Sequence, residues 1–148
     1  MKIELLTVFR PLWIAISLSA ILVSGCSVPT LESPECSASR GTVKEFYSAH
    51  FGNEMKFTAE NLKPKEKFLT AELIESVRGA SPETDVFTTG TTDIPKAFRI
   101  GGCELGDSAR TKVEIILFWR DDSRSEERKI HAEVVKRGDK WLINKILN

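Results

Sequence analysis

The first apolar segment of the chain is short and lies close to its start. Residues 12–23 form a run in which only Ser17 and Ser19 are polar. A hydrocarbon core of about 30 Å takes roughly 20 apolar residues to cross, so this run is too short for a typical transmembrane helix. Its length fits the hydrophobic region of a secretory signal, and the residues ahead of it carry the weak positive charge, from Lys2 and Arg10, that such signals show.

Apolar residues spaced by three and four predict a first helix further along. Thr42 and Glu45 match the capping-box pattern, which places the start of the helix at Thr42, and Gly52 is placed to end it. The predicted apolar face consists of Val43, Phe46, Tyr47 and His50.

The same spacing predicts a second helix that begins after Thr70 and ends at Gly79, preceded by a helical turn that starts near Pro64. Its predicted stripe is Leu69, Leu73, Ile74 and Val77.

Three lysines, Lys63, Lys65 and Lys67, precede this second helix. They suggest either an anion-binding patch or a solvated face. Because Glu60 and Glu66 are interleaved with them, the solvated face is the favoured interpretation, and Lys65→Ala is expected to be nearly silent.

A threonine-rich segment, residues 81–95, shows no periodicity and is predicted to be a loop anchored by Phe87 and Ile94. Loops of this length are uncommon inside a compact domain and are often functional or disordered.

From Phe98 the apolar period changes from 3.6 to 2 and predicts four strands. Gly101 and Gly102 are expected to bend the first strand, and residues 105–107 to form the turn after it. The second strand, 109–119, is apolar on both faces in its second half and is therefore expected to be central. Helices followed by such a meander predict an α+β domain, with helices packed on a four-stranded antiparallel sheet. The core is expected to centre on Phe46, Leu117, Trp119 and Trp141.

The residues Leu22 to Cys26, at the end of the first apolar run, resemble the lipobox of bacterial lipoprotein precursors. The resemblance implies that residues 1–25 are a signal peptide and that Cys26 carries diacylglycerol as the mature N-terminus. Two or three acyl chains give durable anchoring. Ser27 in place of Asp favours the outer membrane, facing the periplasm, in a Gram-negative host. An ordinary secretory signal and a short membrane anchor are the alternatives.

Removal of the signal leaves 123 residues, enough for one domain. Residues 26–41, which contain prolines and serines but no periodicity, are predicted to be a flexible tether, and residues 42–148 the domain. The whole chain has 21 basic and 21 acidic residues. Removal of the signal takes away two basic residues and one acidic residue, so the mature chain has 19 basic and 20 acidic residues. This balance argues against a nucleic-acid partner and gives no polybasic patch, so the membrane is expected to be a partner only through the lipid on Cys26.

Two cysteines, Cys36 and Cys103, remain after Cys26 is assigned to lipid. An even pair in an oxidising compartment predicts a disulfide, with two free thiols as the alternative. Neither cysteine has a nearby His or Cys, which disfavours a metal site.

Three segments together resemble a family of bacterial envelope lipoproteins of the YbjP type, whose function is unknown. The resemblance implies a nuclear-transport-factor-2-like, cystatin-like cone with a curved sheet. Here Asn144 and Lys145 replace the acidic pair that often ends these proteins. The segments are Val43-Lys44-Glu45-Phe46-Tyr47, then Asp85-x-Phe87-Thr88-Thr89 with Thr91-Thr92 and Ile94-Pro95, and finally Gly138-Asp139-Lys140-Trp141-Leu142-Ile143.

Three functions are compatible with these observations. The first is a non-catalytic interaction domain that supports an envelope assembly by binding an envelope protein or a peptidoglycan component. The second is a binder of small apolar ligands in the concavity between helices and sheet. The third is a hydrolase or isomerase of the cone fold, which a histidine within hydrogen-bonding distance of a buried acid would favour. No catalytic residue, cofactor or metal ligand is assigned. The residues placed at a pocket or loop are Phe46, Tyr47, Phe87, Trp119 and Trp141.

Overall fold

The structure is a computed structural model that describes residues 32–52, 55, 58–81 and 83–148. The predicted signal peptide and the lipidation site Cys26 lie outside the described residues. Residues 32–148 form one compact unit. Its elements are α2 (Pro34–Phe51), α3 (Ala59–Leu62), the 3₁₀ helix η2 (Lys63–Phe68), α4 (Ala71–Arg78), β1 (Ala97–Asp107), β2 (Arg110–Arg120), β3 (Ser125–Arg137) and β4 (Lys140–Leu147).

Helix α2 begins at Pro34, well before the predicted start at Thr42. The Ser33 hydroxyl accepts a hydrogen bond from the Cys36 backbone N–H, and Pro34 occupies the first turn, where its missing N–H costs nothing. The serines that suggested a tether are accommodated by the helix, since the Ser39 hydroxyl donates to the Glu35 carbonyl at 2.7 Å. The prediction of a tether as far as residue 41 was therefore wrong, and the capping box at Thr42 lies inside the helix.

The second predicted helix is confirmed as α4. The Thr70 hydroxyl accepts a hydrogen bond from the Leu73 N–H, and Gly79 caps the other end. Backbone contacts then attach the start of this helix to the sheet, because the Thr70 N–H donates to the Ile143 carbonyl at 3.0 Å.

The four strands form an antiparallel meander in the order β1-β2-β3-β4. Strand β2 is central, as predicted, and is buried on both faces: Ile115 faces the helices and its neighbour Ile116 the opposite side, and both are almost fully buried. The register shifts between Ile100 and Cys103, so Gly101 and Gly102 form the expected irregularity. The first predicted turn was misplaced, because residues 105–107 continue β1 and the chain turns at residues 108–109.

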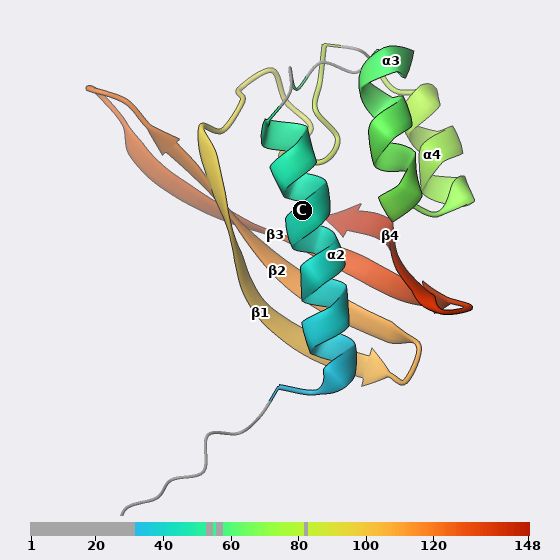
Figure 1. The fold of residues 1–148 in the computed structure, drawn as a ribbon. Coiled ribbons are helices and arrows are strands. Elements are labelled where there is room, and N and C mark those ends of the chain that lie inside the picture. The colour runs from blue at the N-terminus through green and yellow to red at the C-terminus, as the bar shows by residue number, and fades with distance from the viewer. Residues whose placement is uncertain (1–31, 53–54, 56–57, 82) are drawn as a thin grey trace, which may run out of the picture. The chain divides into compact units, whose positions relative to one another are not determined.

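Figure 1 shows the sheet curving around α2, which crosses its concave face. Helix α2 packs on β1, β2 and β4, whereas η2 and α4 pack on β4. This arrangement confirms the predicted α+β class with helices on a four-stranded antiparallel sheet. Within the described part of the chain, no helix has both the length and the apolar character needed to cross a membrane.

The core lies between α2 and the concave face of the sheet. Phe46, Leu117 and Trp119 are buried there as predicted. The centroids of the Phe46 and Phe87 rings lie 4.6 Å apart. Trp141, the fourth predicted member, is only half-buried and packs at the border of the core, because it lies on the edge strand β4.

The predicted disulfide between Cys36 and Cys103 is present, with 5.7 Å between the two Cα atoms. It joins the first turn of α2 to β1 just after the irregularity at Gly101 and Gly102. Of the two residues expected to anchor the loop 81–95, Phe87 is buried, whereas Ile94 is 40% exposed and is not part of the hydrophobic core. The buried anchor near Ile94 is the following residue, Pro95.

Candidate functional site

A cluster of buried polar side chains lies at the C-terminal end of α2. His50 comes from the last turn of α2, Lys65 from η2 and Asp85 from the loop that precedes β1. Each of these residues is at most 3% exposed, although their side chains are among the most costly to remove from water. We call Lys65, His50 and Asp85 the buried triad.

The triad forms a continuous chain of contacts. The Lys65 Nζ atom lies 3.0 Å from His50 Nδ1, and His50 Nε2 lies 2.8 Å from the Asp85 Oδ2 atom. An ammonium group can only donate hydrogen bonds, so Nδ1 accepts from a charged Lys65. With that donor, the other ring nitrogen, Nε2, is the one that faces the Asp85 carboxyl group. The imidazole ring of His50 thus joins the amino group of Lys65 to the carboxyl group of Asp85.

Asp85 also organises the loop in which it lies. Its second carboxylate oxygen, Oδ1, accepts a hydrogen bond from the Phe87 N–H at 3.0 Å. Its backbone carbonyl accepts from the N–H groups of Thr88 and Gly90, and Gly90 adopts the left-handed conformation that glycine tolerates. One residue therefore links the threonine-rich loop to α2 through its side chain and closes the turn through its backbone.

Tyr47 lies one helical turn before His50 and makes a second link to this loop. Its hydroxyl donates a hydrogen bond of 2.6 Å to the Phe87 carbonyl. Full burial, together with the nearby negative charge of Asp85, raises the pKa of Tyr47 well above its ordinary value. Burial lowers the pKa of Lys65, and the charge of Asp85 opposes this effect.

The raised Tyr47 pKa predicts a loss of stability at alkaline pH. The folded chain retains the phenolic proton above pH 10, whereas the unfolded chain releases it near its ordinary pKa of about 10. The contribution of this group to stability is therefore complete below pH 10 and is lost as the pH rises toward the folded-state pKa. Tyr47 is the only tyrosine in the sequence, so tyrosinate absorbance in an alkaline titration reports on it alone. We expect this absorbance to appear together with the loss of circular dichroism. Ionisation near pH 10 in the folded protein would contradict the burial of Tyr47.

The prediction that Lys65 belongs to a solvated face was wrong. Lys63 and Lys67 are exposed, but Lys65 points inward between two apolar residues of the same face, Leu62 and Phe68. These three residues are spaced by three, which is the period of a 3₁₀ helix, whereas the α-helical period was the one considered. The spacing of Leu62, Lys65 and Phe68 after Pro64 was the sequence signal that could have revealed the buried lysine.

The triad meets one criterion for a catalytic histidine, because a buried acid lies within hydrogen-bonding distance of His50. A general base also needs a ring nitrogen that can reach the substrate proton. Here Nδ1 contacts Lys65, Nε2 contacts Asp85, and the ring is 1% exposed. The contacts of the buried triad therefore join α2, η2 and the loop. The other histidine, His131, is half-buried on β3 opposite Glu114.

The concavity between helices and sheet, which was predicted to hold an apolar ligand, is filled by the side chains that were predicted to line it. Phe46, Tyr47 and Phe87 are completely buried and contact one another. Trp119 is also buried, and its indole N–H donates to the Asp93 carbonyl. Trp141 is half-buried on β4 and packs against this core. The structure thus places four of the five predicted residues in one core and the fifth at its border, and none of them in the wall of a chamber.

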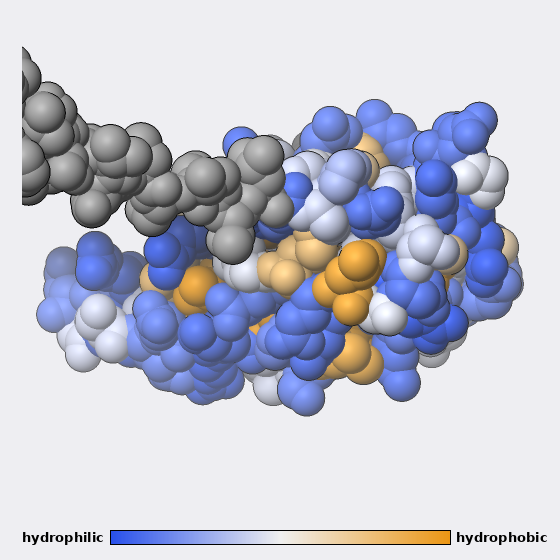
Figure 2. All heavy atoms as spheres, turned by 90° about the horizontal axis from the view of Figure 1, so that it is seen from below, coloured by the Kyte–Doolittle hydropathy of each residue, from blue (hydrophilic) through white to orange (hydrophobic). Residues whose placement is uncertain are grey.

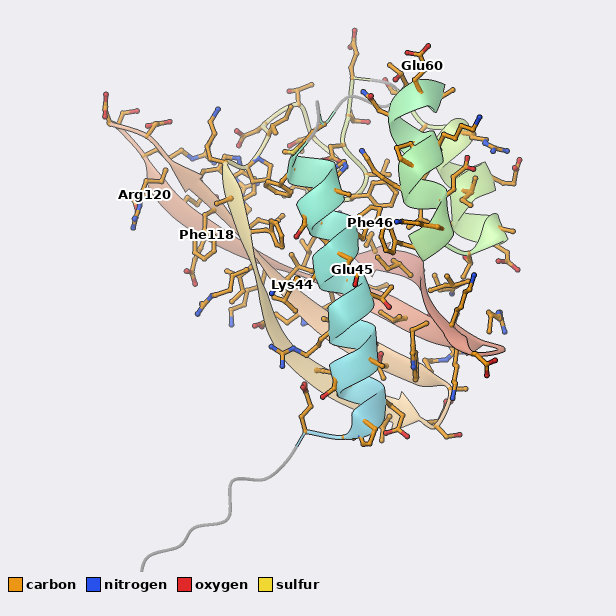
Figure 3. All side chains as sticks on the ribbon, in the orientation of Figure 1. Lys44, Glu45, Phe46, Glu60, Phe118 and Arg120 are labelled. Carbon is orange, nitrogen blue, oxygen red and sulfur yellow. A yellow bond between two sulfur atoms is a disulfide. The ribbon has the colours of Figure 1, made fainter. Side chains whose placement is uncertain are left out.

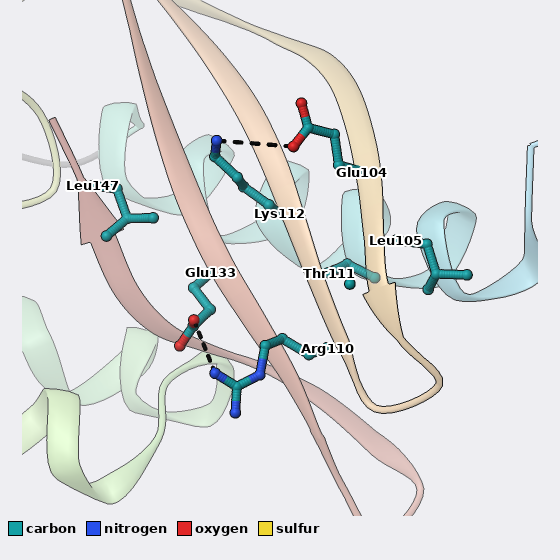
Figure 4. Close-up of a pocket in the computed structure, with 8 residues that line it drawn as sticks. Glu104, Leu105, Arg110, Thr111, Lys112, Glu133 and Leu147 are labelled. Atoms are coloured by element: carbon teal, nitrogen blue, oxygen red, sulfur yellow. Dashed lines mark hydrogen bonds and ion pairs between the residues drawn. The ribbon is translucent and has the colours of Figure 1, made fainter.

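Among the surface depressions outside this core, two involve α2 or the β1–β2 hairpin. One, of about 560 Å³, runs between α2 and η2 and includes Lys44, Glu45 and Lys67. The other, of about 270 Å³, lies beside the β1–β2 hairpin (Figure 4). Leu105 and Leu147 contribute to its lining, and two ion pairs cross it, from Arg110 to Glu133 at 3.1 Å and from Lys112 to Glu104 at 3.8 Å.

Comparison with known proteins supports the fold and gives no activity. No family model and no curated protein matches the chain. A crystal structure of a protein of unknown function from Bacteroides thetaiotaomicron superposes with a TM-score of 0.53 at 20% identity, covering 93% of this chain and 99% of that one. The NTF2-like potential transfer protein TraM from the Gram-positive conjugative plasmid pIP501 gives a TM-score of 0.49 at 18% identity, covering 76% and 94%. At this identity the likeness to the Bacteroides protein concerns the fold alone. The four-stranded antiparallel sheet with helices on one face fits a nuclear-transport-factor-2-like fold.

Proposed function

We propose that this protein is a lipid-anchored envelope protein of the YbjP type, and that its cone-like domain binds a partner without catalysing a reaction. The partner class is an envelope protein or a peptidoglycan component, and the membrane attachment is the lipid on Cys26. The observation that carries the proposal is the lipobox-like segment Leu22 to Cys26, which ends six residues before the compact domain starts at Glu32.

The packing of the domain supports a role without catalysis. Its interior is occupied by Phe46, Tyr47 and Phe87, and the described contacts of His50 engage both ring nitrogens. A ligand chamber or a general base would need open space at these residues. The surface of the domain is therefore where recognition would take place.

Lipid attachment is tested by labelling cells with a palmitate analogue. We expect the full-length chain to be labelled and the Cys26→Ser variant not to be, because the thiol of Cys26 is the acceptor in the lipobox assignment. The variant with Cys36→Ser and Cys103→Ser is the matched control, since it also loses cysteine but should keep the label. Equal labelling of the wild type and Cys26→Ser would contradict the proposal.

The binding role is tested by crosslinking the native lipoprotein in intact envelopes and isolating it. We expect a reproducible adduct with one envelope protein or with peptidoglycan. A chain that stays folded and lipidated but gives no such adduct would contradict an interaction role.

A further inference from the structure

The early start of α2 leaves only a short connection between the domain and the proposed lipid site. Six residue steps separate Cys26 from Glu32, the first residue of the compact unit. Even fully extended, they reach only about 20 Å at 3.3–3.6 Å per residue. Helix α2 alone, with 18 residues, is about 27 Å long. A lipid on Cys26 would therefore keep the N-terminal end of α2 close to the bilayer and would not lift the domain away from it.

The β1–β2 hairpin lies at this same end of the domain. The disulfide between Cys36 and Cys103 joins the first turn of α2 to β1, and Leu105 follows Cys103 by two residues. In Figure 1 the start of α2 and the turn between β1 and β2 lie side by side. The hairpin is thus tied covalently to the part of the domain nearest the lipid.

The surface at this end is apolar at its centre and electrically balanced. Leu105 is 50% exposed, more than any other large apolar residue among those described. It borders the depression that Leu147 also lines, and the cations there, Arg110 and Lys112, are each paired with a glutamate. Seen from this end, apolar residues gather in the middle and hydrophilic residues surround them (Figure 2).

We propose that the β1–β2 hairpin is a membrane-docking element, with Leu105 reaching the boundary between lipid headgroups and acyl chains. The proposal rests on the lipid attachment at Cys26. The anchor holds the hairpin at the bilayer, so a single exposed leucine suffices for a contact that would be too weak for a free protein. Because Arg110 and Lys112 are paired with acids, the contact depends on apolar burial and is insensitive to anionic lipid and to salt.

The opposite end of the domain provides an internal reference. Strand β2 has 11 residues and separates the β1–β2 turn from the β2–β3 turn by about 35 Å. The threonine-rich loop is tied to that far end, where Arg124 pairs with Asp93 at 2.9 Å. This end would face away from the bilayer and remain available to a partner.

The test uses the full lipidated chain in phosphatidylcholine vesicles whose acyl chains carry a doxyl quencher. A single environment-sensitive fluorophore is attached to Ala109→Cys in the β1–β2 turn or, as the matched control, to Asp122→Cys in the β2–β3 turn. Both positions are exposed, and the native cysteines are occupied by lipid or by the disulfide. We expect strong quenching and a blue shift at position 109, and neither at position 122.

A second pair of variants tests the leucine itself. With the fluorophore at position 109, Leu105→Glu should abolish most of the quenching while the protein still floats with the vesicles. Ile94→Glu changes the other exposed large apolar residue, which is in the threonine-rich loop, and should leave the quenching unchanged. Added salt should leave it unchanged as well.

The two proposals fail in different ways. Wild-type protein that does not float with vesicles would overturn lipid attachment at Cys26 and, with it, the docking. Protein that floats but shows equal quenching at positions 109 and 122, or none at either, would overturn the docking alone. Quenching that persists in Leu105→Glu would also overturn it.

Discussion

Replacing Lys65 by alanine is expected to lower the free energy of unfolding by about 3–5 kcal/mol, because it leaves the buried Asp85 carboxylate without its compensating cation. The ammonium group contacts His50 Nδ1 at 3.0 Å, and that nitrogen would lose its donor as well. The loss is measured by urea unfolding of the soluble domain, made without the signal and Cys26. The result would be the reverse of the silent substitution that the lysine-rich sequence suggested.

The matched control is Lys63→Ala, which changes the same residue type in the same short helix. Lys63 is exposed, so its substitution should change stability by no more than about 0.5 kcal/mol. Similar unfolding midpoints for Lys65→Ala and Lys63→Ala would show that the buried triad does not stabilise the fold. Asp85→Ala and the double variant with Lys65→Ala complete the cycle, in which the two losses should not add because the residues share one network.

Replacing Phe46 by alanine is expected to cost about 3–5 kcal/mol, the usual cost of truncating a buried phenylalanine. Phe46 is completely buried and lies at the centre of the core, where its ring contacts Phe68 and Phe87 and stacks on His50. Since folded domains are stable by only about 5–15 kcal/mol, the variant should be close to unfolding at physiological temperature.

Phe118→Ala is the control for Phe46→Ala. Phe118 is half-buried on the opposite face of the sheet, and Figure 3 shows it away from Phe46. Its truncation should cost clearly less. Thermal melts of the two variants distinguish a packed core from a ligand chamber. A Phe46→Ala domain with the melting temperature of the wild type would show that Phe46 lines open space.

The loss of stability in Trp141→Ala should lie between the losses in Phe46→Ala and Phe118→Ala, because Trp141 packs only at the border of the core.

Much of the architecture could be predicted because each signal is local. The Thr70 cap, the glycine at the end of α2 and the alternation of β2 depend on residues within one or two turns of one another. The start of α2 was missed although its signal is local as well. Its capping residue, Ser33, lies in a segment of prolines and serines that resembles a linker by composition, although Ser33 and Pro34 satisfy the rules for a helix start.

The candidate site depended on contacts between distant parts of the chain. His50 and Asp85 are separated by 35 positions, and Lys65 lies between them in a helix of a different period. Each residue alone is ordinary in its local sequence. Their significance arises only when α2, η2 and the loop meet and water is excluded, because burial makes a charged group without its partner costly.

The sequence by itself determined helix α4, the order of the strands and the central position of β2, because apolar periodicity expresses these directly. Only the tertiary structure decided that the concavity is filled, that Lys65 contacts His50 and that Cys36 is bonded to Cys103. These three properties depend on how side chains pack across elements, and the periodicity of a single element carries no information about its packing partner.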